Sequence, residues 1–384
     1  MKYSFDTVVP RRGTSSVKWD RIPDVLPMWV ADMDFKAAPC ILEALQHKLD
    51  HGIFGYTQVP DRYFDAEIEW FRRRHGWEIK REWILPVGGL VPAASVAIKA
   101  LTDPGDEVIV QVPAYNCFFN NVKNTGCRIS ENRLVYSDGA YSIDFEDFER
   151  RCRTAKVFLL CNPQNPVGRL WTREELERMG GICMKYGVAV ISDEIHCDIV
   201  PPGKAYTPFA AIKPEFADHC VSFNSPTKCF NLAGLLISNI VASNPDILHR
   251  IEKVICDWEH RDLNQFGVAA LPAAFSEEGE LWLNEMNAYV HGNFLYLKDR
   301  LKEELPMFPV LELEATYLVW VDCSALSVST KELEQSLILN EKVWVNSGTM
   351  YGDDRFIRIN IACPRSVLEQ GLDRIIAGIR RMMD

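Results

Sequence analysis

The sequence has no run of about 20 apolar residues, the length that a membrane-spanning helix needs. Residues 1–20 contain no continuous apolar core, so we expect no secretory signal there. Neither an internal repeat nor a low-complexity tract interrupts the 384 residues. We therefore expect a globular protein of the cytoplasm that has no membrane partner.

Motifs that bind metal ions are missing as well. The twelve cysteines form no C-x-x-C pair, and the eight histidines form no H-E-x-x-H motif. We predict that the protein has no metal site. Scattered cysteines in a long chain without an export signal are typical of reduced thiols in a cytoplasmic protein.

Positive charge is in deficit, since 42 Lys and Arg stand against 53 Asp and Glu, a net charge of −11. This balance disfavours nucleic acid as a main partner. Hydrophobic residues make up 47% of the chain, enough at this length for a large core and two domains. We place a large domain at residues 48–284, and a small domain at residues 1–47 together with 285–384.

Short apolar runs alternate with amphipathic stretches through the middle of the chain. Thr172 and Glu175 form a capping-box pattern that begins a helix, and Gly187 ends it. This alternation predicts an α/β fold with a mostly parallel central sheet and helices on both faces. We expect strands at Glu107–Val112, Lys156–Cys161, Val188–Ser192, Cys220–Phe223 and Ile237–Ala242.

The last third of the chain changes character. Apolar stripes of helical period predict a long helix at Leu281–Leu305 and a closing helix at Pro364–Met383. Between them, Tyr317–Val321 and Phe356–Ile361 have the composition of strands. These elements predict a smaller α+β domain, which the N-terminal arm joins.

The stretch that organises the chain is SFNSPTKCFNLAGLL, residues 222–236, which centres on Lys228. Pro226 and Asn231 interrupt regular structure, so we expect Lys228 on a turn at the carboxyl end of a strand. Ligands bind at that end of open α/β sheets, and a lysine there can attack a carbonyl to form a Schiff base. A surface lysine is the ordinary alternative, so other features must decide.

Three further features favour one cofactor. Asp193 ends an apolar strand, where a carboxylate is costly without a cationic partner such as a pyridinium nitrogen. The turn Gly88-Gly89-Leu90 before a helix, with Ser225 beside the lysine, is suited to a phosphate. Arg358 in an apolar strand is suited to a carboxylate. Together with Lys228 they predict pyridoxal 5′-phosphate (PLP).

One N-terminal segment has two interpretations. Trp29–Phe35, with the sequence WVADMDF, is both apolar and acidic and lies between prolines. A structural arm and a loop that lines the substrate site are both compatible with this composition.

In this order, NPQNPVG, SDEIH, SPTKCFNLAGL and RINIACPR resemble the class I/II aminotransferase superfamily of fold-type I PLP enzymes. RRGTSSVKWD, MWVADMDF, HGIFGYT and RHGWEIKREWI resemble one branch in particular. That branch contains the cystathionine β-lyases and cysteine-S-conjugate β-lyases of the MalY/PatB kind. The resemblance runs from end to end, and the combination is specific although each motif alone is not.

The resemblance implies roles for individual residues. Lys228 would be the Schiff-base lysine and Asp193 the pyridinium partner, both catalytic. Tyr115, also counted as catalytic, would stack on the pyridine ring, and Arg358 would bind the substrate α-carboxylate. The remaining cofactor contacts would come from Asn165, Gly89, Leu90, Ser225, His196 and, from a neighbouring subunit, Tyr56.

This use of Tyr56 implies a homodimer with active sites at the subunit interface. The sequence departs twice from the wider superfamily. His196 stands where many aminotransferases have a tyrosine, and Leu235-Leu236-Ile237 offers no arginine for the phosphate. Both departures fit the β-lyase branch better than the aspartate aminotransferases.

The resemblance implies cleavage of L-cystathionine or related cysteine S-conjugates to a thiol, pyruvate and ammonia by α,β-elimination. Transamination is the main alternative, because it requires the same lysine, aspartate and arginine, and spacing cannot separate the two reactions. The third hypothesis is a regulatory protein that retains the fold but has no enzymatic activity. Its relatives with DNA-binding modules would need a further N-terminal domain, which we do not expect here.

Overall fold

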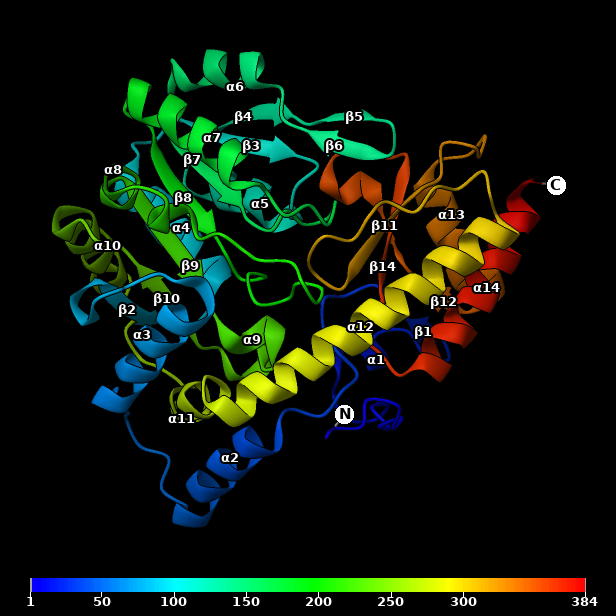
Figure 1. The fold of residues 1–384 in the computed structure, drawn as a ribbon, viewed down its shortest axis with the longest axis horizontal. Coiled ribbons are helices and arrows are strands. Elements are labelled where there is room, and N and C mark those ends of the chain that lie inside the picture. The colour runs from blue at the N-terminus through cyan, green and yellow to red at the C-terminus, as the bar shows by residue number, and fades with distance from the viewer. Residues whose placement is uncertain (1, 384) are drawn as a thin grey trace.

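The computed structural model describes residues 2–383 and contains a seven-stranded sheet of order β2-β10-β9-β8-β7-β3-β4 (Figure 1). Strand β10 is antiparallel to both of its neighbours, and the other pairings are parallel, so the predicted mostly parallel sheet is confirmed. The strands are β2 (Ile84–Val87), β3 (Glu107–Val112), β4 (Arg128–Arg133), β7 (Ala155–Cys161), β8 (Ala189–Asp193), β9 (Cys220–Asn224) and β10 (Ser238–Val241).

Helices cover both faces of this sheet because its strands are apolar on both sides. In β3, Val108 and Val110 belong to one core, whereas Ile109 belongs to the other. The core of Val108 includes helices α4 (Leu90–Leu101), α5 (Asn116–Asn124) and α10 (Pro245–Asp257). The core of Ile109 includes α3 (Asp61–His75), α6 (Phe145–Cys152), α7 (Arg173–Tyr186), α8 (Pro214–Asp218) and α11 (Gln265–Ala274).

A smaller antiparallel sheet of order β11-β14-β13 lies to one side of the large sheet. The long helix α12 (Glu277–Glu304) runs diagonally toward it, past α11, and packs on α14 (Figure 1). The elements here are β11 (Leu318–Asp322), β12 (Val343–Trp344), β13 (Asn346–Ser347), β14 (Phe356–Asn360), α13 (Thr330–Ser336), the π-helix η4 (Leu337–Glu341) and α14 (Arg365–Met383). The domain boundary at residues 284/285 stays a prediction.

The N-terminal arm reaches the smaller sheet through Met28, whose carbonyl accepts from the N–H of Asn360 in β14. Its strand β1 (Leu26–Pro27) pairs in parallel with β12 in a separate two-stranded sheet. The arm also contains α1 (Val17–Asp20), and α2 (Pro39–His51) follows it. A separate hairpin of β5 (Val135–Ser137) and β6 (Ala140–Ser142) follows β4 in the chain. The arm therefore pairs with an element that lies more than three hundred residues later in the sequence.

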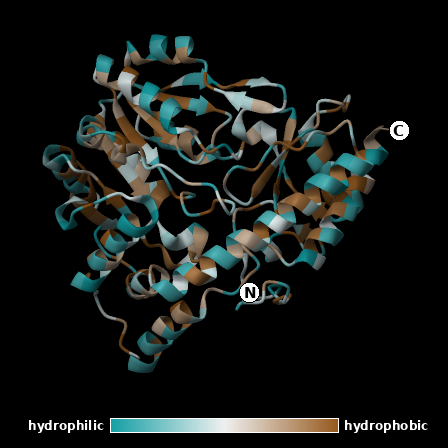
Figure 2. Ribbon diagram, in the orientation of Figure 1, coloured by the Kyte–Doolittle hydropathy of each residue, from teal (hydrophilic) through white to brown (hydrophobic). Residues whose placement is uncertain are grey.

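Local sequence rules account for several element ends. Thr172 and Glu175 form the predicted capping box at the start of α7, and Gly187 ends that helix with positive φ. Figure 2 shows hydrophobic colour along the strands and the inward sides of the helices, with hydrophilic colour on the outer turns. Within residues 2–383, no helix is both long and apolar enough to span a bilayer.

Candidate active site

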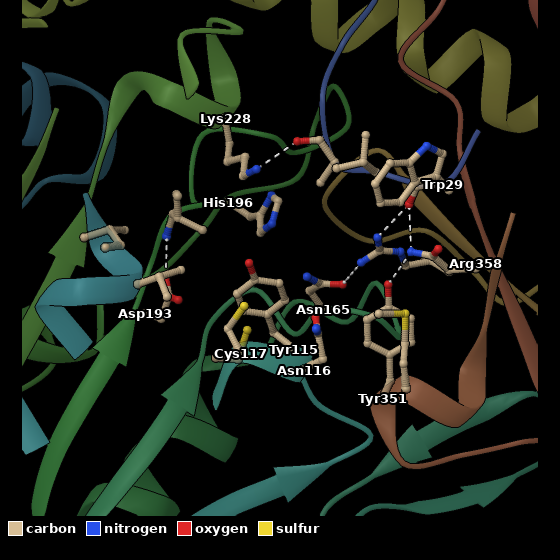
Figure 3. A pocket seen from close by; sticks show the side chains of 18 residues that line it. Trp29, Tyr115, Asn116, Cys117, Asn165, Asp193, His196, Lys228, Tyr351 and Arg358 are labelled. Atoms are coloured by element: carbon tan, nitrogen blue, oxygen red, sulfur yellow. Dashed lines mark hydrogen bonds between the residues drawn. The ribbon is translucent and has the colours of Figure 1, made fainter. Parts of the chain in front are cut away.

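A cavity of about 310 Å³ lies where the carboxyl ends of the parallel strands meet the smaller sheet (Figure 3). Strands β3, β7, β8 and β9 each lead into a residue of its wall. This is the edge at which open α/β sheets bind ligands. The predicted site residues that line it are Leu90, Tyr115, Asn165, Asp193, His196, Lys228 and Arg358.

Lys228 lies on α9 (Pro226–Cys229), a single helical turn directly after β9. The prediction that no regular element holds it is wrong, because Pro226 fits the first helical position and Ser225 caps the turn. The amine donates to the carbonyl of Ala31 at 2.8 Å. Burial lowers the pKa of Lys228, which favours the neutral amine that a nucleophile requires.

Asp193, the last residue of β8, is a buried carboxylate with one hydrogen bond among the described residues, from the backbone N–H of Ile195 at 3.2 Å. Burial raises its pKa to about 6, against the opposing effects of that N–H and of Lys228. A buried carboxylate so poorly paired is ready to accept a cationic ligand.

Arg358 lies on the opposite side of the cavity, in β14 (Figure 3). Its guanidinium donates to Asn165 Oδ1 at 3.0 Å and to the carbonyl of Trp29 at 2.9 Å, and packs 4.6 Å from the ring centre of Tyr351. Its Nε has no partner among residues 2–383 although it is buried. The guanidinium is therefore fixed in place with donor capacity to spare for a carboxylate.

Two ring side chains lie between these ends. Burial raises the pKa of Tyr115 above its usual range, so its hydroxyl stays protonated. Burial, with the charges of Lys228 and Arg358, lowers the pKa of His196 to about 3. The imidazole is thus neutral, and its buried Nδ1 has no partner in the described part of the chain.

The start of α4 forms another part of the wall. Leu90 and Val91 line the cavity and belong to the first turn of the helix, whose N–H groups have no partner within the helix. Gly89 precedes them with φ 136° and ψ 151°, a conformation that is essentially confined to glycine. The helix dipole and these N–H groups favour an anion such as a phosphate.

Three predicted cofactor contacts, Gly89, Ser225 and Tyr56, are not among the residues that line the cavity. The hydroxyl of Ser225 donates to the carbonyl of Ile237 at 2.7 Å and accepts from the N–H of Thr227 at 3.1 Å. Tyr56, in the loop between α2 and α3, is 96% exposed. Their contacts with a cofactor stay predictions.

The structure also brings in residues that the sequence left ambiguous or did not reveal. Trp29, Val30 and Ala31 line the cavity, so this part of the N-terminal segment is a site-lining loop. Spacing gives no signal for the others, because loops and short elements position them through tertiary packing. They include Val91, Asn116, Cys117, Cys161, Ile195, Asn346, Met350 and Tyr351.

These residues fit PLP. The cavity offers an amine for the aldehyde, an under-paired carboxylate for a pyridinium nitrogen, and a helix start for the phosphate. Asn165 is buried in the wall, and its Nδ2 has no hydrogen-bond partner among residues 2–383, so it is free to donate to the cofactor's phenolic oxygen.

The model of the family described as aminotransferase class I and II matches residues 23–375. The chain belongs to this family. Within it, the chain is 43% identical to cystathionine beta-lyase PatB of Bacillus subtilis, over 98% of this chain and all of that protein. It is 32% identical to protein MalY of Escherichia coli, over 98% of this chain and 99% of that one.

Solved structures agree with this placement. Cystalysin of Treponema denticola, which contains pyridoxal 5′-phosphate, is 35% identical, with a TM-score of 0.96 over 99% of this chain and 100% of that chain. The PLP-bound C–S lyase of Staphylococcus hominis is 33% identical, with a TM-score of 0.92 over 98% of both chains. The predicted fold and the predicted branch of the family are confirmed.

Proposed function

We propose that the protein is a PLP-dependent carbon–sulfur β-lyase. It cleaves L-cystathionine or related L-cysteine S-conjugates to a thiol, pyruvate and ammonia. The observation that carries this proposal is one cavity holding the amine of Lys228, the under-paired carboxylate of Asp193 and the guanidinium of Arg358. The relatives named as cystathionine β-lyases and C–S lyases support elimination as the reaction.

The cofactor would be held by residues from four strand ends and one helix start. Lys228 would bond its aldehyde carbon, and Asp193 would pair with the ring nitrogen and keep it protonated. Tyr115 would cover the ring, and Asn165 would donate to the phenolic oxygen. The backbone N–H groups near Gly89 and Leu90, with the hydroxyl of Ser225, would bind the phosphate.

PLP, when bound, supplies an aldehyde that joins the substrate's amino group and a protonated ring that withdraws electrons from Cα. Arg358 binds the α-carboxylate and thereby fixes the orientation of Cα. Lys228, whose pKa burial lowers, removes the Cα proton as a general base. The Cβ–S bond then breaks, the thiolate takes up a proton, and water converts the remaining fragment to pyruvate and ammonia.

We further propose that the active protein is a cytoplasmic homodimer whose two-fold interface completes the site. The loop between α2 and α3 exposes Ile53 by 68%, Phe54 by 58% and Tyr56 by 96%. An apolar patch of this kind favours a protein partner. Twelve free cysteines, nine of them buried, suit a reducing compartment.

The decisive experiment measures pyruvate and free thiol released by the PLP-loaded protein from L-cystathionine and S-methyl-L-cysteine, with and without 2-oxoglutarate. We expect pyruvate without the keto acid. Lys228→Ala should lose this activity by at least about 10³-fold, because both the covalent link and the base disappear. Lys302→Ala, on the exposed face of α12, is the matched control and should retain it. Turnover that depends on the keto acid would instead identify an aminotransferase.

The shared site has its own test. Homodimers of Lys228→Ala and homodimers of Tyr56→Ala are each expected to be impaired. Mixing and reassembling the two variants should restore part of the activity, because each hybrid dimer contains one site with both residues intact. A mixture no more active than its components would contradict the contribution of Tyr56 across the interface.

A further inference from the structure

The cavity has two cationic side chains among the residues that the structure describes, Lys228 and Arg358. Under the proposed function, on which this inference rests, Lys228 serves the cofactor and Arg358 serves the α-carboxylate. Neither is then available to a charge on the sulfur substituent. The rest of the wall near Arg358 is apolar, aromatic or neutral amide: Trp29, Val30, Asn116, Asn346, Met350 and Tyr351.

Aromatic groups flank the position that the substrate's α-carboxylate would take. Trp29 and Tyr351 lie beside Arg358 in Figure 3. The guanidinium contacts the carbonyl of Trp29 and the ring of Tyr351. Cβ is one bond from Cα, and we place a substituent on it against this part of the wall. Met350, 43% exposed, extends the apolar surface outward and adapts readily to ring substituents.

The aromatic wall is also rigid. The ring of Trp29 stacks on Trp344 with 4.2 Å between centroids and 11° between planes. Arg21 packs over both rings, with its guanidinium carbon 5.4 Å from the centroid of Trp29. Arg21 is exposed and does not line the cavity. Arg21 therefore serves as a control, because it tests whether a positive charge outside the cavity contributes to substrate binding.

The proposed dimer would add no charge to this region through its exposed loop. Residues 52–60 read GIFGYTQVP and contain no Asp, Glu, Lys or Arg. The exposed apolar side chains of that loop, Ile53 and Phe54, match the wall in chemistry. Both the cavity and the loop that would complete it thus favour an uncharged substituent.

We propose that the site selects L-cysteine conjugates with an uncharged, apolar S-substituent, such as an alkyl or benzyl group, over L-cystathionine. The distal half of L-cystathionine carries an ammonium and a carboxylate, which lose hydration against this wall without gaining a charged partner. A benzyl group instead gains burial and aromatic contacts with Trp29 and Tyr351.

The test compares kcat/KM for pyruvate release from S-benzyl-L-cysteine and L-cystathionine by the PLP-loaded protein. We expect the benzyl conjugate to be favoured by about tenfold or more. Equal values, or a preference for L-cystathionine, would overturn the selectivity and leave the lyase activity standing. Failure of the proposed function is distinguishable, because then neither compound yields pyruvate without a keto acid.

Three variants place the selectivity on the wall. Met350→Arg puts a cation at the rim and should shift the ratio toward L-cystathionine by about fivefold or more. Leu339→Arg, the same change of charge on an exposed residue of η4, should leave the ratio unchanged. Arg21→Ala should either lower kcat/KM equally for both substrates or leave both values unchanged. A selective loss of L-cystathionine turnover in that variant would show that Arg21 binds the distal carboxylate and would refute the proposal.

Discussion

Asp193 and Asp198 are two buried carboxylates at the ends of one short segment after β8, yet their surroundings differ sharply. Asp198 accepts hydrogen bonds from Trp70 Nε1 at 3.0 Å, Arg74 Nε at 3.1 Å and His75 Nε2 at 3.0 Å. Asp193 accepts one, from a backbone N–H. Burial alone would raise both pKa values. The hydrogen bond from His75 and the charges of His75 and Arg74 instead leave the pKa of Asp198 lowered.

The difference separates an anchor from a binding group. Asp198 ties α3 to the segment after β8, and its donors are all supplied by the fold. Burial destabilises the ionised form of Asp193, and its one hydrogen bond offsets little of this cost. A buried carboxylate of this kind is typical of a site where a ligand supplies the missing cationic partner. Substitutions should therefore affect function at one position and stability at the other.

The largest expected effect is at Asp193. Asp193→Asn should lower kcat/KM for pyruvate release by about 10³-fold, because an amide cannot keep the ring nitrogen of the cofactor protonated. The melting temperature of the cofactor-free protein should not fall, since the variant removes an under-paired buried charge. A variant whose melting temperature and kcat/KM are both near the wild-type values would contradict the proposed difference in role between the two carboxylates.

Asp198→Asn should act on stability instead. We expect it to lower the free energy of unfolding by about 3 kcal/mol, since buried donors from α3 lose a charged acceptor. Because the pKa of Asp198 is lowered in the fold, its contribution is complete above the usual value near 3.8 and is lost as the pH falls below it. Urea titrations of both proteins at several pH values measure this. An unchanged midpoint at pH 7 would contradict the anchoring role.

The smallest effect is a pH dependence of stabilisation by PLP. Asp193 in the cofactor-free fold has a pKa of about 6, so its carboxylate is ionised and under-paired at pH 7 but largely protonated at pH 5. At pH 5 the carboxyl must lose a proton before it can pair with the ring nitrogen of the cofactor, whereas at pH 7 it is already ionised. Its stabilisation should therefore be greater at pH 7 than at pH 5, by about 1 kcal/mol. Thermal shifts with and without PLP test the sign, and Asp193→Asn should abolish this part of the difference.

Sequence reasoning reached the strand ends of this site, because short β-branched runs followed by polar residues mark where strands stop. Asp193 was placed correctly at a strand end in this way, and Arg358 was placed correctly within an apolar strand. Lys228 was placed correctly after the carboxyl end of its strand, but its helical turn was missed, since Pro226 was taken as an interruption although proline is favourable at the first position of a helix. Asn346, Met350 and Cys117 could not be predicted, because only tertiary packing brings their elements to the cavity.

The hydrogen bond between Arg358 and the carbonyl of Trp29 has a consequence for folding during translation. The two residues are 329 positions apart, and Asn346 donates to the same carbonyl. During translation, which proceeds from the N-terminus, the carbonyl of Trp29 emerges early, and these two donors become available only when nearly the entire chain has left the ribosome. Closing so long a loop comes late in folding. A chain that ends just before Arg358 contains every strand of the large sheet, but it lacks the guanidinium that would hold the substrate's carboxylate.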